Sequence, residues 1–201
     1  MSARVVCCLV FFAAVLSAAE EYTYWIDECT PEAARATACD ADDPQLGQWA
    51  LEAWQRESKG AVTFRKSASA AHARVAIHWA NGATSLYGET VPLVVDGRPG
   101  AAIYVLPDTR GLGAAIDRAT NGDRLLRDAV VYLTFLHESG HALGLKHTAE
   151  FADIMYSFRY GGDIVEYFER YRRQLKTRAD MPAHSGISDA DRQALRSALA
   201  H

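Results

Sequence analysis

The most constraining feature of the sequence is one histidine-rich segment, His137-Glu138-Ser139-Gly140-His141-Ala142-Leu143-Gly144-Leu145-Lys146-His147. His137 and His141 are four residues apart, so in a helix both imidazoles leave the same face. Gly144 can adopt a positive φ, which would end the helix abruptly. The chain would then turn back and bring His147 toward the other two imidazoles. The segment therefore predicts a helix, a sharp turn and three imidazoles that meet at one point.

Three neutral imidazoles are typical of a catalytic zinc site, because they leave the fourth position of a tetrahedral ion for water. Zinc lowers the pKa of such a water to about 7, and a neighbouring carboxylate can then accept its proton. We therefore expect one Zn²⁺ bound by His137, His141 and His147, with Glu138 as the general base. The alternative is a surface helix with three unrelated histidines, which the regular spacing disfavours.

The N-terminus predicts a secretory signal peptide. Met1 to Arg4 carries one positive charge, Val5 to Leu16 is uninterrupted apolar sequence, and Ser17-Ala18-Ala19 supplies the small residues of a cleavage site. The apolar stretch is shorter than the roughly 20 residues that cross a bilayer, so an uncleaved anchor is the less favoured alternative. We expect residues 1–19 to be removed, residues 20–201 to form one domain, and the mature protein to be secreted.

Secretion determines how the remaining cysteines are interpreted. Cys7 and Cys8 belong to the signal peptide, whereas Cys29 and Cys39 stay in the mature chain and would meet an oxidising compartment. A disulfide is then the expected state, with a stabilisation of about 3 kcal/mol from closing a short loop. The alternative is a thiolate that blocks a metal site.

Composition excludes several partners. The chain of 201 residues is 49% hydrophobic and 23% charged, as in folded globular proteins, and its formal net charge of −4 provides no broad basic surface. We therefore expect no nucleic-acid partner. Because no segment after the signal peptide is apolar enough to cross a bilayer, we also expect no stable membrane association. We further expect the protein to be a monomer.

Local patterns predict a strand, a helix, several strands and then further helices, which indicates one α+β domain. Asp43 followed by Pro44 is typical of a helix start, with Asp43 as the N-cap. Ser188 and Asp191 resemble a capping box at the start of the last helix. The expected strands are 22–26, 62–64, 74–79, 91–95 and 101–106, and the expected helices are 43–60, 125–145, one through Ile164, Phe168, Tyr171 and Leu175, and one from Ser188 to Leu199.

A methionine follows the third histidine in Asp153-Ile154-Met155-Tyr156. Together with the histidine segment it resembles the metzincins, in which such a Met-turn lies beneath the zinc ligands. Among metzincins the chain resembles the matrixins, the catalytic domains of matrix metalloproteinases. The resemblance extends to Tyr22–Ile26, Ala73–Trp79 and Ile187–Asp191 and covers most of residues 20–200. It implies a zincin fold with a twisted mixed sheet, a long zinc-binding active-site helix, the Met-turn and a C-terminal helix.

The resemblance also implies a metalloendopeptidase that hydrolyses peptide bonds of a protein or peptide substrate. We expect the substrate to lie along an edge strand at Ala101–Leu106, in contact with Ala101, Ile103 and Tyr104. Tyr156 and Ser157 would form the wall of the pocket for the side chain after the scissile bond, and Tyr156 would not bind zinc. The alternative is a non-catalytic, zinc-stabilised binding module on the same fold, which the presence of Glu138 disfavours.

The chain departs from the matrixin pattern in four places. The predicted signal peptide leads almost directly into the first strand, so we expect no propeptide. The sequence has no histidine between Gly82 and Leu136 for a second, structural zinc, and calcium binding stays undetermined. Ser157 replaces the usual proline after the Met-Tyr pair. The connection from Arg159 to Gly186 is longer than usual.

This longer connection allows two interpretations. Its aromatic residues could line or cover the pocket and so shape specificity. Alternatively, Phe168 and Tyr171 could simply pack a helix onto the domain, since apolar residues at helical spacing usually face a core. The aromatic residues concerned are Phe158, Tyr160, Tyr167, Phe168 and Tyr171.

Overall fold

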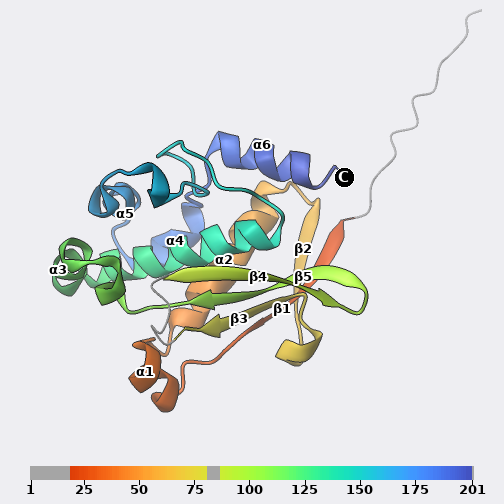
Figure 1. The fold of residues 1–201 in the computed structure, drawn as a ribbon, viewed down its shortest axis with the longest axis horizontal. Coiled ribbons are helices and arrows are strands. Elements are labelled where there is room, and N and C mark those ends of the chain that lie inside the picture. The colour runs from red at the N-terminus through yellow and green to blue at the C-terminus, as the bar shows by residue number, and fades with distance from the viewer. Residues whose placement is uncertain (1–18, 81–86, 201) are drawn as a thin grey trace, which may run out of the picture.

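A five-stranded sheet, covered on one face by two long helices, organises the chain (Figure 1). The computed structural model describes residues 19–80 and 87–200. Residues 1–18 of the predicted signal peptide lie outside the described residues, so the cleavage site and the limits of the domain remain predictions. Among the described residues, no helix is both long and apolar enough to span a membrane.

The strands follow the order β2-β1-β3-β5-β4 across the sheet. Strands β2, β1, β3 and β5 run parallel to one another, and β4 is antiparallel to β5. The register aligns Ile77 with Ile103 and Ile103 with Thr90, which makes β5 an interior strand and β4 an edge strand. The mixed sheet of the predicted α+β zincin fold is thereby confirmed. The strands are β1 (Glu20–Ile26), β2 (Val62–Lys66), β3 (Val75–Trp79), β4 (Gly88–Val95) and β5 (Arg98–Val105).

Helices α2 and α4 pack against each other over the sheet (Figure 1). Leu46, Ala50 and Trp54 recur at helical spacing along α2 and are fully buried. The indole N–H of Trp54 donates to the main-chain oxygen of Leu136 in α4 at 2.9 Å. The helices are α1 (Pro31–Thr37), α2 (Asp43–Glu57), α3 (Ala114–Gly122), α4 (Arg124–Ala142), α5 (Ile164–Arg172) and α6 (Asp189–Ala198), with 3-10 turns at Ala70–His72, Thr109–Leu112, Phe158–Tyr160 and Arg178–Ala183.

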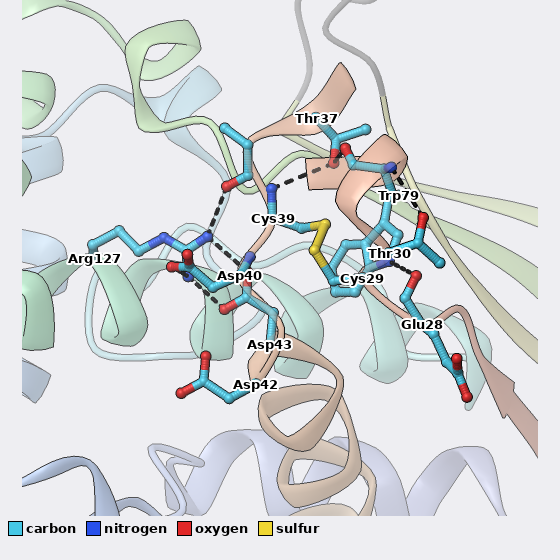
Figure 2. Close-up of a disulfide and its surroundings, with 12 residues drawn as sticks. Glu28, Cys29, Thr30, Thr37, Cys39, Asp40, Asp42, Asp43, Trp79 and Arg127 are labelled. Carbon is cyan, nitrogen blue, oxygen red and sulfur yellow. Dashed lines mark hydrogen bonds and ion pairs between the residues drawn. A yellow bond between two sulfur atoms is a disulfide. The ribbon is translucent and has the colours of Figure 1, made fainter. Parts of the chain in front are cut away.

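The predicted disulfide is present and closes the loop that contains α1 (Figure 2). Cys29 follows β1 and Cys39 precedes α2, and their Cα atoms are 6.0 Å apart. Arg127 reaches this loop from α4, where its Nη2 lies 2.7 Å from Asp43 Oδ2 and 3.2 Å from the main-chain oxygen of Ala38. The disulfide loop is therefore attached to the helix that carries the first two histidines.

The start of α2 differs from the prediction. Asp42, not Asp43, occupies the N-cap position, and its side chain makes no capping hydrogen bond. Asp43 is the first helical residue and is completely buried. Its carboxylate accepts hydrogen bonds from Arg127 and from the main-chain N–H of Asp40. The sequence patterns also did not predict the short helices α1 and α3.

The long connection after the Met-turn contains α5 and packs largely as the structural interpretation expects. Tyr167, Phe168 and Tyr171 are buried, and Tyr171 stacks on Tyr132 of α4 with ring centroids 5.4 Å apart. These three aromatic side chains therefore fix α5 to the core. At the end of the connection, α6 begins with the predicted capping box of Ser188 and Asp191.

Candidate zinc centre and active site

The three histidines of the motif meet at one point, as the spacing predicts. Their ligand atoms lie within 4.8 Å of one another. Helix α4 presents His137 and His141 from adjacent turns, and Gly144 ends the turn with φ of 89°. His147 Nε2 then lies 3.1 Å from His137 Nε2 and 3.1 Å from His141 Nε2.

Hydrogen bonds orient two of the rings and fix their tautomers. His137 Nδ1 is 2.7 Å from the main-chain oxygen of Ile154, and His141 Nδ1 is 2.9 Å from that of Leu145. A carbonyl oxygen can only accept, so both Nδ1 atoms carry the proton and both Nε2 atoms keep a free lone pair. This is the arrangement in which a second partner holds a metal-binding imidazole.

Partial burial of the three histidine side chains keeps their imidazoles neutral. Burial lowers the pKa of His137 to about 3, with further lowering by the neighbouring histidines against a rise from its hydrogen bond to Ile154. Burial also lowers the pKa of His141 and of His147. Neutral imidazoles are the form that binds metal, so no proton has to be displaced at pH 7.

The residues present fit a zinc ion. Zn–N bonds of about 2.0–2.1 Å at tetrahedral angles would place ligand nitrogens about 3.3 Å apart. The nitrogen separations of 3.1 Å that involve His147 are close to this value. Three imidazoles alone make a ligand set that leaves one position open.

Glu138 lies beside this group on the inner side of α4 and is only 6% exposed. Burial raises the pKa of its carboxyl to about 7, against a lowering by the hydrogen bond from Thr90. A carboxyl group with a pKa near neutral pH can both accept and return a proton. Glu138 therefore combines a position beside the three histidines with a carboxyl group that can exchange protons near pH 7.

Met155 packs beneath the helix between the first two histidines. Its side chain is fully buried, and a Cβ added at Gly140 would lie 2.5 Å from Met155 Sδ. The main-chain oxygen of Met155 accepts a hydrogen bond from the N–H of Thr148 at 2.9 Å, which ties the turn to the segment after His147. The close approach of Met155 Sδ to Gly140 explains why this position of α4 is a glycine.

A cleft of about 630 Å³ opens at the histidines. The histidines and Glu138 lie at its base, edge strand β4 contributes one group of lining residues, and the segment after Met155 contributes the other. The lining residues other than those four are Tyr87, Gly88, Thr90, Pro92, Tyr156, Ser157, Phe158 and Arg159.

The predicted substrate-binding edge was wrong. Segment Ala101–Leu106 supplies most of β5, which is paired with β3 on one side and β4 on the other. Ala101 and Ile103 are buried, and Tyr104 lies beside His78 with ring centroids 5.5 Å apart. None of these three side chains lines the cleft, and the edge strand beside the cleft is β4.

The main-chain groups of β4 alternate between β5 and the free edge. The carbonyl of Tyr87 accepts from the N–H of Leu106 at 2.8 Å, so odd-numbered residues face β5. Thr90, Pro92 and Val94 therefore direct their main-chain groups outward, although Pro92 has no N–H to offer.

The other predicted wall is at the cleft. Tyr156 and Ser157 both line it. The Tyr156 hydroxyl donates to the main-chain oxygen of Gly161 at 2.5 Å, which holds this side chain in place. Phe158 joins the wall, so one aromatic residue at the start of the long connection does face the cleft.

Comparison with protein families gives the same result as the geometry. The family model of the matrixins matches residues 17–166. The chain belongs to the matrixin family. The matched segment contains the whole sheet, helices α1 to α4, the three histidines and Met155. A comparison with curated proteins finds no match.

A second group of potential metal ligands in this matrixin is acidic and is held by arginines. Asp40, Asp42 and Asp43 lie together at the start of α2 (Figure 2). Arg127 and Arg124 approach Asp40 at 3.3 Å and 3.0 Å, and Arg178 lies 3.3 Å from Asp42. Because guanidinium groups already neutralise these carboxylates, the group is explained as a salt-bridge network.

Sequence reasoning missed Gly88, Thr90 and Pro92 as cleft residues of this matrixin. The predicted strand began at Val91, after the first two of them. A strand extended back to Gly88 would place residues 88, 90 and 92 on one face.

Proposed function

We propose that this matrixin is a secreted, zinc-dependent endopeptidase in which His137, His141 and His147 bind the ion and Glu138 is the general base. The observation that carries the proposal is the convergence of three Nε2 atoms beside a buried carboxylate at the base of an open cleft. The zinc-stabilised binding module shares the three histidines, but it has no use for a buried carboxylate beside them.

When bound, zinc supplies Lewis-acid activation of water and of the scissile carbonyl group. Glu138 accepts a proton from the attacking water at a carboxylate oxygen as the new C–O bond forms. Glu138 then returns this proton to the leaving nitrogen as the C–N bond breaks, which balances the reaction. Glu138 is only 6% exposed, which limits the access of bulk water to its carboxylate.

The free edge of β4 supports an extended peptide as the substrate. A peptide that adds a strand to this edge can form main-chain hydrogen bonds with Thr90 and Val94 and with the carbonyl of Pro92. Its side chains would then contact Tyr156, Ser157 and Phe158 across the cleft. We expect β4, in place of the interior strand β5, to set the direction of the bound chain.

Secretion is supported by the apolar N-terminal sequence and by the disulfide between Cys29 and Cys39. N-terminal sequencing of the protein isolated from its host tests this part of the proposal. A mature chain that begins at Glu20 is the expected result, and a chain that keeps Val5–Leu16 would indicate a tethered peptidase.

The enzymatic proposal is tested by metal analysis together with cleavage of a broad peptide library. The native protein should contain one Zn²⁺ per chain and cut peptides. Glu138→Ala should keep the zinc and lose about 10²–10⁴-fold in turnover. Glu150→Ala, an exposed carboxylate after the motif, is the matched control and should keep both. A native protein that binds zinc and cuts no peptide would instead indicate the binding module.

A further inference from the structure

The hydroxyl of Thr90 contacts the proposed general base directly. Thr90 Oγ1 lies 2.6 Å from Glu138 Oε2 and 3.0 Å from the main-chain oxygen of Glu138. The main-chain oxygen and the ionised carboxylate can only accept from it, and the hydroxyl has a single proton. The shorter distance and the carboxylate charge assign this proton to Oε2. Thr90 therefore donates a charge-assisted hydrogen bond to Glu138.

Strand β4 holds this hydroxyl in place. Thr90 pairs with Ile103 of β5, and its β-branched side chain has restricted χ1 freedom. Two residues earlier on the same face, a Cβ added at Gly88 would lie 2.5 Å from Glu138 Oε1 and 2.9 Å from its Cγ. The strand therefore passes over both carboxylate oxygens, with a hydroxyl at one and the space left by a glycine at the other.

We propose that Thr90 is a positioning residue for Glu138, an inference that rests on the proposed function. The terminal torsion of a glutamate is broad, so burial alone does not fix the plane of its carboxylate. The Thr90 hydroxyl fixes Oε2 and leaves Oε1 to accept and return the proton. Because Thr90 also directs its main chain to the free edge of β4, one residue sets both the base and the register of the peptide.

Kinetics of three variants test the positioning role. Thr90→Val removes the hydroxyl at nearly constant volume and should lower kcat by about 10–100-fold, with KM within about threefold and zinc content unchanged. Thr90→Ser restores the hydroxyl and should recover kcat to within about fivefold of the native value. Thr134→Val is the matched control, because its hydroxyl donates to the main-chain oxygen of Val130. Its kcat should stay within about twofold.

A double-mutant cycle on thermal stability gives a second readout that needs no peptidase activity. Thr90→Val should lower Tm by about 3–6 °C in the native background and by less than about 1 °C in the Glu138→Ala background. If the native protein cuts no peptide, the proposed function fails, whereas the cycle still tests the contact. Native kcat in Thr90→Val, equal damage in Thr90→Ser, or equal Tm shifts in both backgrounds would each overturn the inference.

Discussion

The carboxylate of Asp191 accepts a hydrogen bond from the main-chain N–H of Ile154 at 2.8 Å. The carbonyl oxygen of this same Ile154 accepts the hydrogen bond from His137 Nδ1 at 2.7 Å. Asp191 also accepts from the main-chain N–H groups of Met155 and Ser188. Helix α6 thus holds the Met-turn at Ile154, and the carbonyl of Ile154 orients the imidazole of His137.

Asp191→Ala is expected to weaken both the fold and the zinc centre. It leaves the buried N–H groups of Ile154 and Met155 without an acceptor, so the free energy of unfolding should fall by about 2–4 kcal/mol. Zinc affinity should fall by about 10–100-fold, because His137 loses its fixed partner. Denaturant unfolding and titration against a competing chelator measure the two effects.

The matched control is Asp189→Ala in the first turn of the same helix. Asp189 is solvent-exposed and pairs with Arg192 at the surface, so its removal should change the free energy of unfolding by less than about 1 kcal/mol. Native zinc affinity in Asp191→Ala would mean that Ile154 keeps its position without the carboxylate.

Gly140→Ala is expected to disturb the packing of Met155. The added Cβ would lie 2.5 Å from Met155 Sδ and 3.1 Å from Trp54 Cζ2, and both side chains are fully buried. We expect a net loss of about 1–2 kcal/mol in the free energy of unfolding, since overpacking outweighs the gain in helix propensity. At Gly122 a new Cβ meets no atom within 4 Å. Gly122→Ala should therefore be neutral or stabilising, and equal losses in both variants would contradict the packing argument.

Replacing Cys29 and Cys39 together by alanine should lower Tm by about 6–12 °C, from the loss of about 3 kcal/mol of loop-closure stabilisation. Zinc content and turnover of the folded variant should be unchanged, because the disulfide loop supplies no residue to the cleft. Thermal melts with and without reductant on the native protein provide the control. An unchanged Tm would show that the Arg127 contacts alone hold the loop.

The pair of His78 and Asp27 predicts a pH-dependent contribution to stability. The hydrogen bond from His78 Nδ1 to Asp27 Oδ2 is 2.9 Å long. It raises the pKa of His78, against a lowering by burial. Burial raises the pKa of Asp27, but the hydrogen bonds from His78 and Trp25 outweigh burial, so this pKa is lowered overall.

The stabilisation from His78 is full below its unfolded pKa of about 6.5 and is lost as pH rises through the raised folded pKa. That from Asp27 is present above about pH 4 and is lost as pH falls through the lowered folded pKa. His78→Gln should therefore cost most near pH 5, about 1 kcal/mol or less for a partly exposed pair, and little at pH 9. Melts of His72→Gln, at an exposed histidine, serve as control, and an equal cost at both pH values would contradict the pairing.

The zinc centre could be predicted from the sequence because its geometry follows local rules. The spacing of His137 and His141 places both on one helix face, and Gly144 supplies the turn that returns His147. The capping box of Ser188 and Asp191 is equally local. In each case the residues that decide the geometry are neighbours in the chain.

The free edge of the sheet could not be predicted in the same way. Strand order depends on pairing between distant segments, and β5 looks like an edge strand until its pairing with both β3 and β4 is known. The contact of Thr90 with Glu138 depends on this order too. Helix α3 was missed because its residues 114–122 are mostly small or polar, with Ile116 as the one large apolar side chain among them.

A strand edge that can receive a peptide can also receive a second copy of the protein, and β4 presents such an edge with Val91 and Val94 exposed on it. Pro92 interrupts the row of outward donors between Thr90 and Val94. A short peptide can still bind beside the histidines, but another β4 cannot pair along the full length of the strand. We expect the missing N–H of Pro92 to disfavour fibril formation through this edge while the edge remains accessible to a peptide. The same residue would then limit both the length of peptide that can pair with β4 and the self-association of the protein.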